Sequence, residues 1–423
     1  MNGPMGPADL IAIVLVLAAL IGCINHLWIG LPPAIGMLLG SLALSLLIVS
    51  SDHVFHLHLM HWFRGTLDAA NLPHLFLDGV LALLLFAGSL HVDIAELSRR
   101  RWMILLLATA SVILSMLVFG AGIWLVFALV GTAVPLLWCF VLSAILAPTD
   151  AVVVETLLRQ VRLPGGLRAA IVGESLFNDG AGVVMFLIAL RATQGETGLI
   201  GHGRVAEALL LEIGGGAALG LAAGWLAARL IRVIRDDGLQ LMISLALALG
   251  CYRLANVCEL SGPIAVVSAG LCIGTLSPHF ASAPGNRSAL VGFWALLGQF
   301  LNTMLFLLIG IQILGLMIQP VQLLAALLAI PLAVAARLIS VAIPWGLTRD
   351  KLRDKARGVA VLTWAGLRGG ISVALALTLP MSPWRTDLLV VTYAVVLFTI
   401  VVQGLTMPPF LRALYGTPPP LPE

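Results

Sequence analysis

Long apolar runs follow one another along the whole chain, and each is close to the length of about 20 residues that an α-helix needs to cross a bilayer. Only short polar or Gly- and Pro-containing segments separate these runs. The pattern predicts an all-α polytopic membrane protein with about thirteen transmembrane helices. The expected spans are 8–25, 30–50, 75–91, 102–130, 133–158, 168–191, 206–234, 238–256, 261–276, 288–316, 320–346, 357–380 and 386–411.

Composition agrees with this pattern. Of the 423 residues, 60% are hydrophobic and only 10% are charged, whereas a soluble domain has about 25% charged residues. No polar block of domain size interrupts the apolar runs, so we expect one membrane transporter domain over residues 1–423 and no soluble regulatory domain. The first apolar run follows no basic segment, which favours a membrane anchor over a cleaved signal peptide. Nucleic acid is not an expected partner, and the lipid bilayer is.

The placement of the basic residues predicts an orientation, because Lys and Arg are enriched in cytoplasmic loops. An odd number of spans puts the termini on opposite sides. With the N-terminus outside and the C-terminus in the cytoplasm, most of the 23 Lys and Arg residues fall in or beside inner loops. These are Arg99, Arg100, Arg101, Arg159, Arg162, Arg168, Arg229, Arg232, Arg235, Arg287, Arg349, Lys351, Arg353, Lys355, Arg357 and Arg412.

Two of the expected spans contain helix-breaking residues near their middle. The fifth span carries Pro-Thr-Asp at 148–150, and the twelfth carries the glycine-rich segment 366–370. Seven spans separate them, so the two spans run in opposite directions. Paired broken helices in oppositely oriented halves indicate an inverted-repeat transporter, with the broken helices crossing at the bilayer midplane where the binding site lies.

The sixth span contains the segment "GESLFNDG" inside an otherwise apolar run. A helical period of 3.6 residues gathers Glu174, Ser175, Asn178 and Asp179 on one face. A charged residue at the bilayer centre costs about 2.5–3.5 kcal/mol even on the lenient insertion scale, so two neighbouring acids favour a functional role. For Ser175 or Asn178 alone, hydrogen bonding between helices is the preferred reading.

The broken fifth span adds oxygen ligands to this face. We expect Pro148 to free backbone carbonyls near Thr149, and Asp150 supplies a further carboxylate. Oxygen ligands of this kind suit a small hard cation, and the absence of His and Cys from the set argues against zinc or copper.

Two arginines lie inside expected spans and need partners for the same energetic reason. Glu174 is a candidate partner for Arg337, which leaves Asp150 and Asp179 to change charge during a cycle. Arg368 is placed to balance the negative C-terminal ends of the half-helices at the crossing. A purely structural brace is the alternative for Arg368.

Four segments together resemble the monovalent cation/proton antiporters, in the branch of the bacterial NhaP and animal NHE sodium/proton exchangers. They are "APTDA", "GESLFNDG", "AARLISV" and "GLRGG", and the resemblance covers the whole chain. It implies an NhaA/NapA-like antiporter fold and a homodimer. It further implies a mobile core at about 102–191 and 320–411, and a dimerisation part at about 8–91 and 206–316.

The resemblance also implies roles for single residues. Asp179 matches the acid that proton and cation occupy in turn, and Asn178 before it marks the electroneutral branch. The family's cation-binding positions, which would hold Na+, are matched by Asp179, Thr149, Ser175, Glu174 and Asp150, and its ion pair by Glu174 and Arg337. Many relatives have Pro after the Thr-Asp pair, whereas this chain has Ala151, so the extent of unwinding on that side is open.

The expected function is electroneutral antiport of one Na+ for one proton in the cell membrane, most simply a bacterial inner membrane, without a cofactor and without enzyme activity. A buried carboxylate holds its proton more tightly, and a nearby cation favours its release, so the two ions compete. A K+/H+ exchanger of the same fold is an alternative. An intramembrane aspartyl protease using Asp150 and Asp179 lacks its expected GxGD-type segment, and a passive cation channel lacks a run of filter carbonyls.

Two further segments have ordinary interpretations. His53, His56, His58 and His61 fall in one outer loop, with His74 following. They are consistent with a metal or pH-sensing site, although an interfacial segment is the preferred reading. The glycine run at 212–224 predicts close packing between helices.

Overall fold

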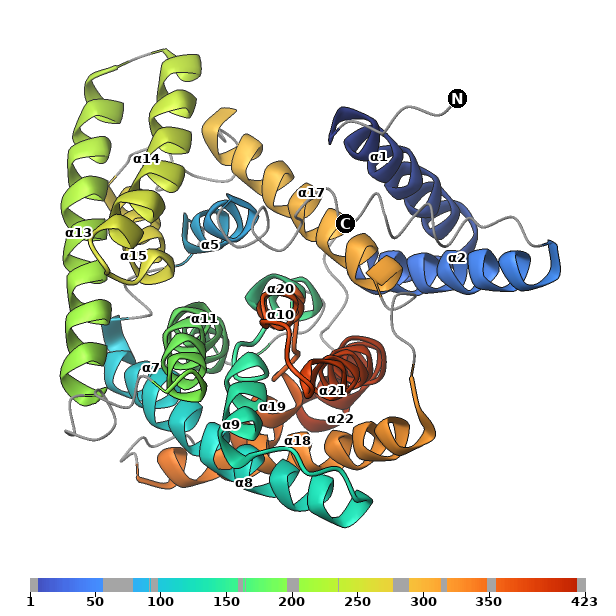
Figure 1. The fold of residues 1–423 in the computed structure, drawn as a ribbon. Helices are drawn as coiled ribbons and strands as arrows, with labels where there is room; N and C mark the ends of the chain where they lie inside the picture. Colours follow the sequence, from blue (N-terminus) through green and yellow to red (C-terminus); the bar gives the residue numbers. More distant parts are fainter. Residues whose placement is uncertain are drawn as a thin grey trace.

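The computed structural model describes residues 7–55, 79–90, 92, 98–158, 163, 165–195, 205–234, 236–276, 289–312, 318–347 and 355–416. Within these ranges all regular secondary structure is helical (Figure 1). The helices are α1 (Pro7–Ile24), α2 (Pro33–Phe55), α5 (Leu81–Leu90), α7 (Arg101–Leu106), α8 (Val112–Val130), α9 (Leu136–Ile145), α10 (Ala151–Leu158), α11 (Gly165–Thr193), α13 (Val205–Val233), α14 (Asp237–Val257), α15 (Gly262–Leu276), α17 (Ala289–Gln312), α18 (Pro320–Leu347), α19 (Lys355–Trp364), α20 (Gly370–Leu377), α21 (Arg385–Leu397) and α22 (Gly404–Tyr415). Three π-helical turns continue neighbouring helices: η1 (Asn25–Ile29), η3 (Leu107–Ser111) and η5 (Phe398–Gln403).

Every expected span contains a helix or a pair of half-helices. By length and composition, 9 helices in the described part of the chain are able to cross a membrane, and α5, α9 and α15 are shorter apolar helices. The all-α architecture expected from the sequence is therefore confirmed. The histidine loop was expected to be an interfacial segment, but the side chains of its five histidines lie outside the described residues.

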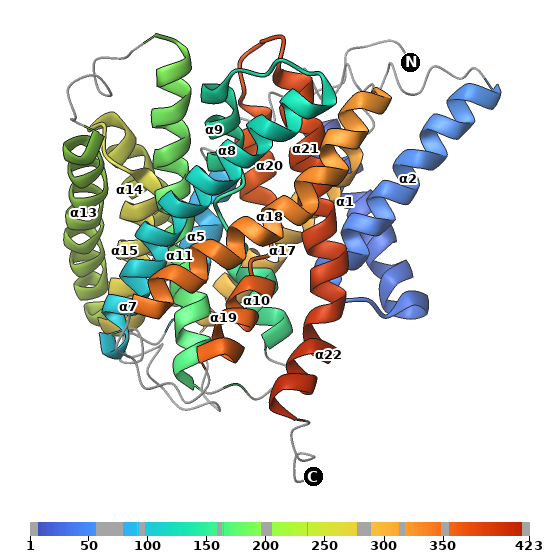
Figure 2. The same cartoon turned by 90° about the horizontal axis from the view of Figure 1, so that it is seen from below.

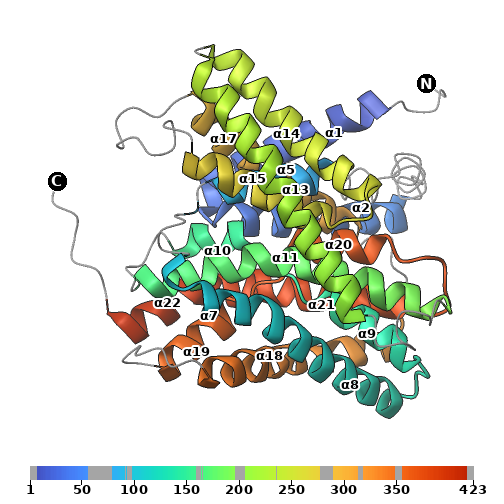
Figure 3. The same ribbon diagram turned by 90° about the vertical axis from the view of Figure 1, so that its left-hand side faces the viewer.

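The helices pack in two groups. In Figure 1, α8, α9, α11 and α18–α22 lie together, while α1, α2, α5, α13, α14, α15 and α17 form the other group. Contacts support this division, because α18 packs on α8 within the first group, and α17 packs on α2 and α13 on α15 within the second. Figure 2 shows α1 and α2 beside α17 at one edge of the molecule. In Figure 3, α14 lies on one side and α8 and α18 on the other, and α13 runs diagonally across the front between them.

The glycine run of α13 packs closely, as the sequence predicts. Gly216, Gly220 and Gly224 recur every four residues, and a Cβ on any of them would lie under 3.0 Å from the backbone of residues 261–269. Three glycines one turn apart therefore let α13 and α15 approach backbone to backbone.

Both predicted breaks are present. Residues 146–150 separate α9 from α10, and residues 365–369 separate α19 from α20. The two breaks touch, because the backbone N–H of Asp150 donates a hydrogen bond of 2.8 Å to the carbonyl of Leu367. Helix resumes directly at Ala151, so the unwound segment ends with Asp150.

Candidate functional site

The polar face of α11 lies against the break between α9 and α10. Glu174, Ser175, Asn178 and Asp179 are all buried, as is Thr149 in the break. Asp150 is partly exposed. The structure thus brings together the six residues that the sequence selects, from two segments that are about 25 residues apart along the chain.

Asn178 connects the break to α11. Its side-chain amide donates hydrogen bonds to Glu174 Oε1 at 2.8 Å and to Thr149 Oγ1 at 2.9 Å. Its Oδ1 accepts from the backbone N–H of Thr149 at 3.2 Å, and Thr149 Oγ1 donates to Ser175 Oγ at 2.9 Å. Ser175 and Asn178 therefore do form the inter-segment hydrogen bonds that the alternative reading expects. The Asn178 Oδ1 bond satisfies the backbone N–H of Thr149, and the bonds of Thr149 Oγ1 tie the unwound segment to α11.

Glu174 is held by Arg337 of α18. The guanidinium donates to both carboxylate oxygens, at 2.8 Å to Oε1 and 2.7 Å to Oε2. Both side chains are buried, with 1% and 6% of their surface exposed. The structure contains the ion pair that intramembrane energetics predict. With Asn178 also bonded to Oε1, Glu174 has its oxygens occupied by protein donors.

Arg368 lies in the second break and reaches into the first. Its guanidinium donates to the carbonyl of Ala147 and, at 3.2 Å, to that of Pro148. The sequence suggests that carbonyls freed by Pro148 are open cation ligands; these two instead accept hydrogen bonds from Arg368. A cation beside the C-terminal carbonyls of a helix is favoured by the helix dipole, so Arg368 takes the position expected for balancing α9.

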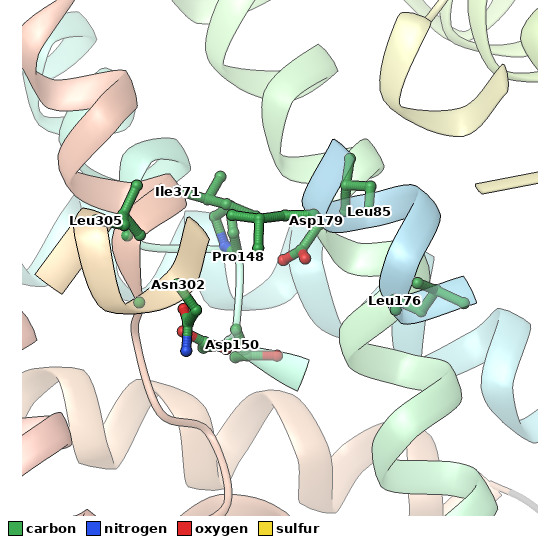
Figure 4. Close-up of a pocket in the computed structure, with 13 residues that line it drawn as sticks. Leu85, Pro148, Asp150, Leu176, Asp179, Asn302, Leu305 and Ile371 are labelled. Carbon is green, nitrogen blue, oxygen red and sulfur yellow. The ribbon is translucent and has the colours of Figure 1, made fainter. Parts of the chain in front are cut away.

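A recess of about 500 Å³, including its open mouth, lies beside the crossing (Figure 4). Of the six predicted residues, Thr149, Asp150 and Asp179 line it, whereas Glu174, Ser175 and Asn178 do not. Asp179 is 4% exposed, and its Oδ1 accepts no hydrogen bond from any described residue. The other lining residues are Leu84, Leu85, Gly88, Pro148, Leu176, Asn302, Leu305, Gly369, Gly370 and Ile371.

The sequence reading missed Asn302 of α17. The one available signal is an amide inside the apolar run "GQFLNTMLFLLIG" of the tenth expected span. Within the described ranges, no three His, Cys, Asp or Glu side chains cluster closely enough to hold a metal ion. A cation beside Asp179 would therefore also need neutral oxygen ligands.

Comparisons with known proteins identify the family of this chain. The sequence model of the family described as "Sodium/hydrogen exchanger, transmembrane" matches residues 13–413. The chain belongs to the sodium/hydrogen exchanger family. Its members are transporters, so this exchanger is not an enzyme, and the aspartyl-protease alternative is excluded.

Two bacterial relatives match this exchanger over almost their whole length. A Na(+)/H(+) antiporter NhaP of Pseudomonas aeruginosa is 36% identical over 97% of this chain and 98% of that protein. A Na(+)/H(+) antiporter NhaH of Halobacillus dabanensis is 30% identical over 90% of this chain and 92% of the relative. The sodium proton antiporter MjNhaP1 of Methanocaldococcus jannaschii has a similar fold, with a TM-score of 0.72 at 21% identity over 97% of this chain and 99% of that one.

Proposed function

We propose that this exchanger is an electroneutral Na+/H+ antiporter in which one Na+ and one proton compete for Asp179 by alternating access. The observation that carries the proposal is the Asp179 carboxylate, which is buried, faces the recess and has an oxygen without a hydrogen-bond donor among the described residues. An unsatisfied buried carboxylate is costly, and either a proton or a cation would relieve that cost.

The hydrogen bonds of Asp179 and of the neighbouring acid Glu174 indicate different roles for the two carboxylates. Glu174 forms two short hydrogen bonds with Arg337, so its charge is already balanced inside the protein. Asp150 uses Oδ1 to accept the Val153 N–H at 3.0 Å at the start of α10 and lines the recess beside Asp179. We assign Asp179 the exchange of proton for cation. Asp150 and the Thr149 oxygens add cation ligands, and Ser175, Asn178 and Glu174 hold them in position.

A one-for-one stoichiometry follows from the charges at the crossing. Asn178 is neutral where a second adjacent acid would stand, and the charge of Glu174 is balanced by Arg337. If one proton leaves as one monovalent cation binds, the moving part keeps a constant charge, and no further charge crosses the low-dielectric interior.

The wider arrangement belongs to the same proposal. We assign the mobile core to about 102–191 and 320–411, and the dimerisation part of a homodimer to about 8–91 and 206–316. The two helix groups of Figure 1 support this division. Basic loops support an orientation with the N-terminus outside and the C-terminus in the cytoplasm. The bacterial relatives support a bacterial inner membrane.

Purified protein in proteoliposomes tests the transport reaction. A pH gradient is imposed, NaCl, LiCl, KCl or choline chloride is added in turn, and internal pH is followed. We expect Na+ to dissipate the gradient and choline to leave it unchanged, and we expect no Na+ response in Asp179→Asn. Dissipation by K+ but not Na+ would favour the K+/H+ alternative. Na+ uptake without proton movement would indicate a channel.

A further inference from the structure

Asn302 has a buried side chain with an amide that lines the recess. It is not one of the six residues predicted from the sequence. It comes from α17, is 9% exposed, and lines the same recess as Thr149, Asp150 and Asp179. No described residue forms a hydrogen bond with its side chain. Figure 4 shows its amide on the side of the recess where Asp150 lies.

The surroundings of Asn302 argue against a packing role. The neighbouring hydroxyl of Thr303 is satisfied within its own helix, donating to the Gln299 carbonyl at 2.8 Å. Leu305, one turn further on, packs so closely on Gly370 that an added Cβ there would collide with its side chain. In this conformation the contact seats α17 against the second break, with the Asn302 amide lining the recess. An amide that lines the recess beside two carboxylates, without a hydrogen bond to a described residue, can offer its oxygen to a ligand in the recess.

The chemistry of the recess identifies the ligand class. Apart from Thr149, Asp150, Asp179 and Asn302, the side chains that line it are apolar, and the two acids alone give a hard cation too few oxygens. An amide oxygen is a neutral ligand of the required kind, and it adds no charge to the site. Asn302 thus supplies an oxygen without disturbing one-for-one exchange.

We propose that the Asn302 amide oxygen is a transient ligand of the transported Na+, supplied by α17 from outside the moving core. The inference rests on the proposed function, because it needs a cation at Asp179 and relative motion of the two helix groups. Since α17 packs on α2 and α5, Asn302 belongs to the group that stays in place. Asn302 contacts the cation in one orientation of the core and not in the other. Its effect on the KM for Na+ should therefore appear on one face of the membrane only.

The test compares Asn302→Leu, which keeps the branched shape of the side chain but removes the oxygen, with Asn302→Asp, which keeps an oxygen. Na+-driven proton flux is measured in right-side-out and everted vesicles. We expect Asn302→Leu to raise the KM for Na+ about fivefold on one face only, equal to about 1 kcal/mol. Maximal rate should stay within about twofold, and Asn302→Asp should keep a KM within about twofold of the unmutated protein. Thr303→Val is the matched control and should change neither face.

Besides an unchanged KM in Asn302→Leu, three results would overturn the inference. They are an equal KM shift on both faces, a KM shift of the same size in Asn302→Asp, and a fall in maximal rate at unchanged KM. The second of these would point to the amide N–H as a donor to a carboxylate, and the third to a structural effect. If the unmutated protein exchanges Na+ and needs Asp179, but Asn302→Leu keeps its KM, only this inference fails. If the unmutated protein does not exchange Na+ at all, the proposed function fails.

Discussion

The break between α9 and α10 and the break between α19 and α20 expose the same kinds of backbone group and carry opposite charges. In each break, a side chain from another segment accepts a hydrogen bond from a freed backbone N–H. Asn178 accepts from Thr149 in the first break, and Thr399 accepts from Arg368 at 3.1 Å in the second. In the first break, Asp150 lines the recess. In the second break, the Arg368 guanidinium donates hydrogen bonds to backbone carbonyls of the first break.

This difference separates two tasks at one crossing. A broken helix has a partial negative charge at its carbonyl end, and a positive charge placed there stabilises it. Arg368 takes this position at α9, and under the proposed function Asp150 and Asp179 hold the exchanged ions. We infer that the second break stabilises and the first break binds cargo. The five predictions below test this division, from the largest expected effect to the smallest.

Asp150→Asn should remove exchange while leaving the fold intact. Asn is as good a helix N-cap as Asp, so the bond from the Val153 N–H to this side chain is kept. The lost charge weakens cation binding by about 2.7 kcal/mol or more, which lowers Na+-driven proton flux about 100-fold. Flux assays in proteoliposomes measure the loss of exchange, and the melting temperature shows whether the fold is intact. Near-normal flux would show that the first break does not bind the cation.

Arg368→Gln should have the opposite effect to Asp150→Asn, lowering the stability of the fold more than the exchange activity. Two buried carbonyls lose a charged donor, at a cost of about 1–3 kcal/mol each. The melting temperature should fall by several degrees, and Arg368→Lys should recover part of it. Arg385→Gln is the control, because Arg385 donates to the Leu379 carbonyl at 3.1 Å from a half-buried position away from the crossing. Equal losses in the two variants would contradict a special role for Arg368.

The Glu174–Arg337 pair should behave as one unit in a double-mutant cycle. Glu174→Ala or Arg337→Ala alone strands a buried charge at a cost of about 3–5 kcal/mol, and the double variant should recover part of that loss. Thermal unfolding of the four proteins gives the coupling energy. Losses that simply add would mean that the two residues are not coupled.

Gly369→Ala should disturb the contact between the breaks. A Cβ at Gly369 would collide with Asp150 Oδ2, so the carboxylate must move from its position at the recess. We expect exchange to fall about tenfold, since a binding group displaced by even 1 Å loses much of its effect. Gly88→Ala adds the same methyl group at the recess, where nothing lies within 4 Å, and should exchange normally. Equal exchange rates in the two variants would show that the contact between Gly369 and Asp150 does not position the Asp150 carboxylate.

The equilibrium of exchange should not respond to voltage in the unmutated protein. One-for-one exchange moves no net charge, although each net charge would contribute about 2.3 kcal/mol per 100 mV. The equilibrium is measured in proteoliposomes whose voltage is set by valinomycin and K+. Asn178→Asp places a second acid 2.8 Å from Glu174 Oε1, where it needs a proton, and should make the equilibrium voltage-dependent. A voltage response in the unmutated protein would reveal a further proton site.

Much of the fold is readable from local pattern. Apolar runs of span length predict the helices, because a bilayer forces backbone hydrogen bonds to close within each segment. Pro148 and the glycines of residues 366–370 locate both breaks, since the first lacks an N–H and the others favour non-helical backbone. The polar face of α11 follows from helical period alone. That Glu174 and Arg337 each need a partner of opposite charge follows from the cost of an unpaired charge in a membrane.

The sequence by itself therefore determined the helices, their breaks and the set of polar residues that must find partners. Only the tertiary structure decided which partner each one has. Glu174, Ser175, Asn178 and Asp179 share one face, yet protein donors occupy Glu174 while Asp179 keeps an open oxygen at the recess. Asn302 reaches that recess from a helix more than a hundred residues away. Periodicity fixes what one helix presents, but contacts between distant segments depend on how whole helices pack, and no local rule contains that information.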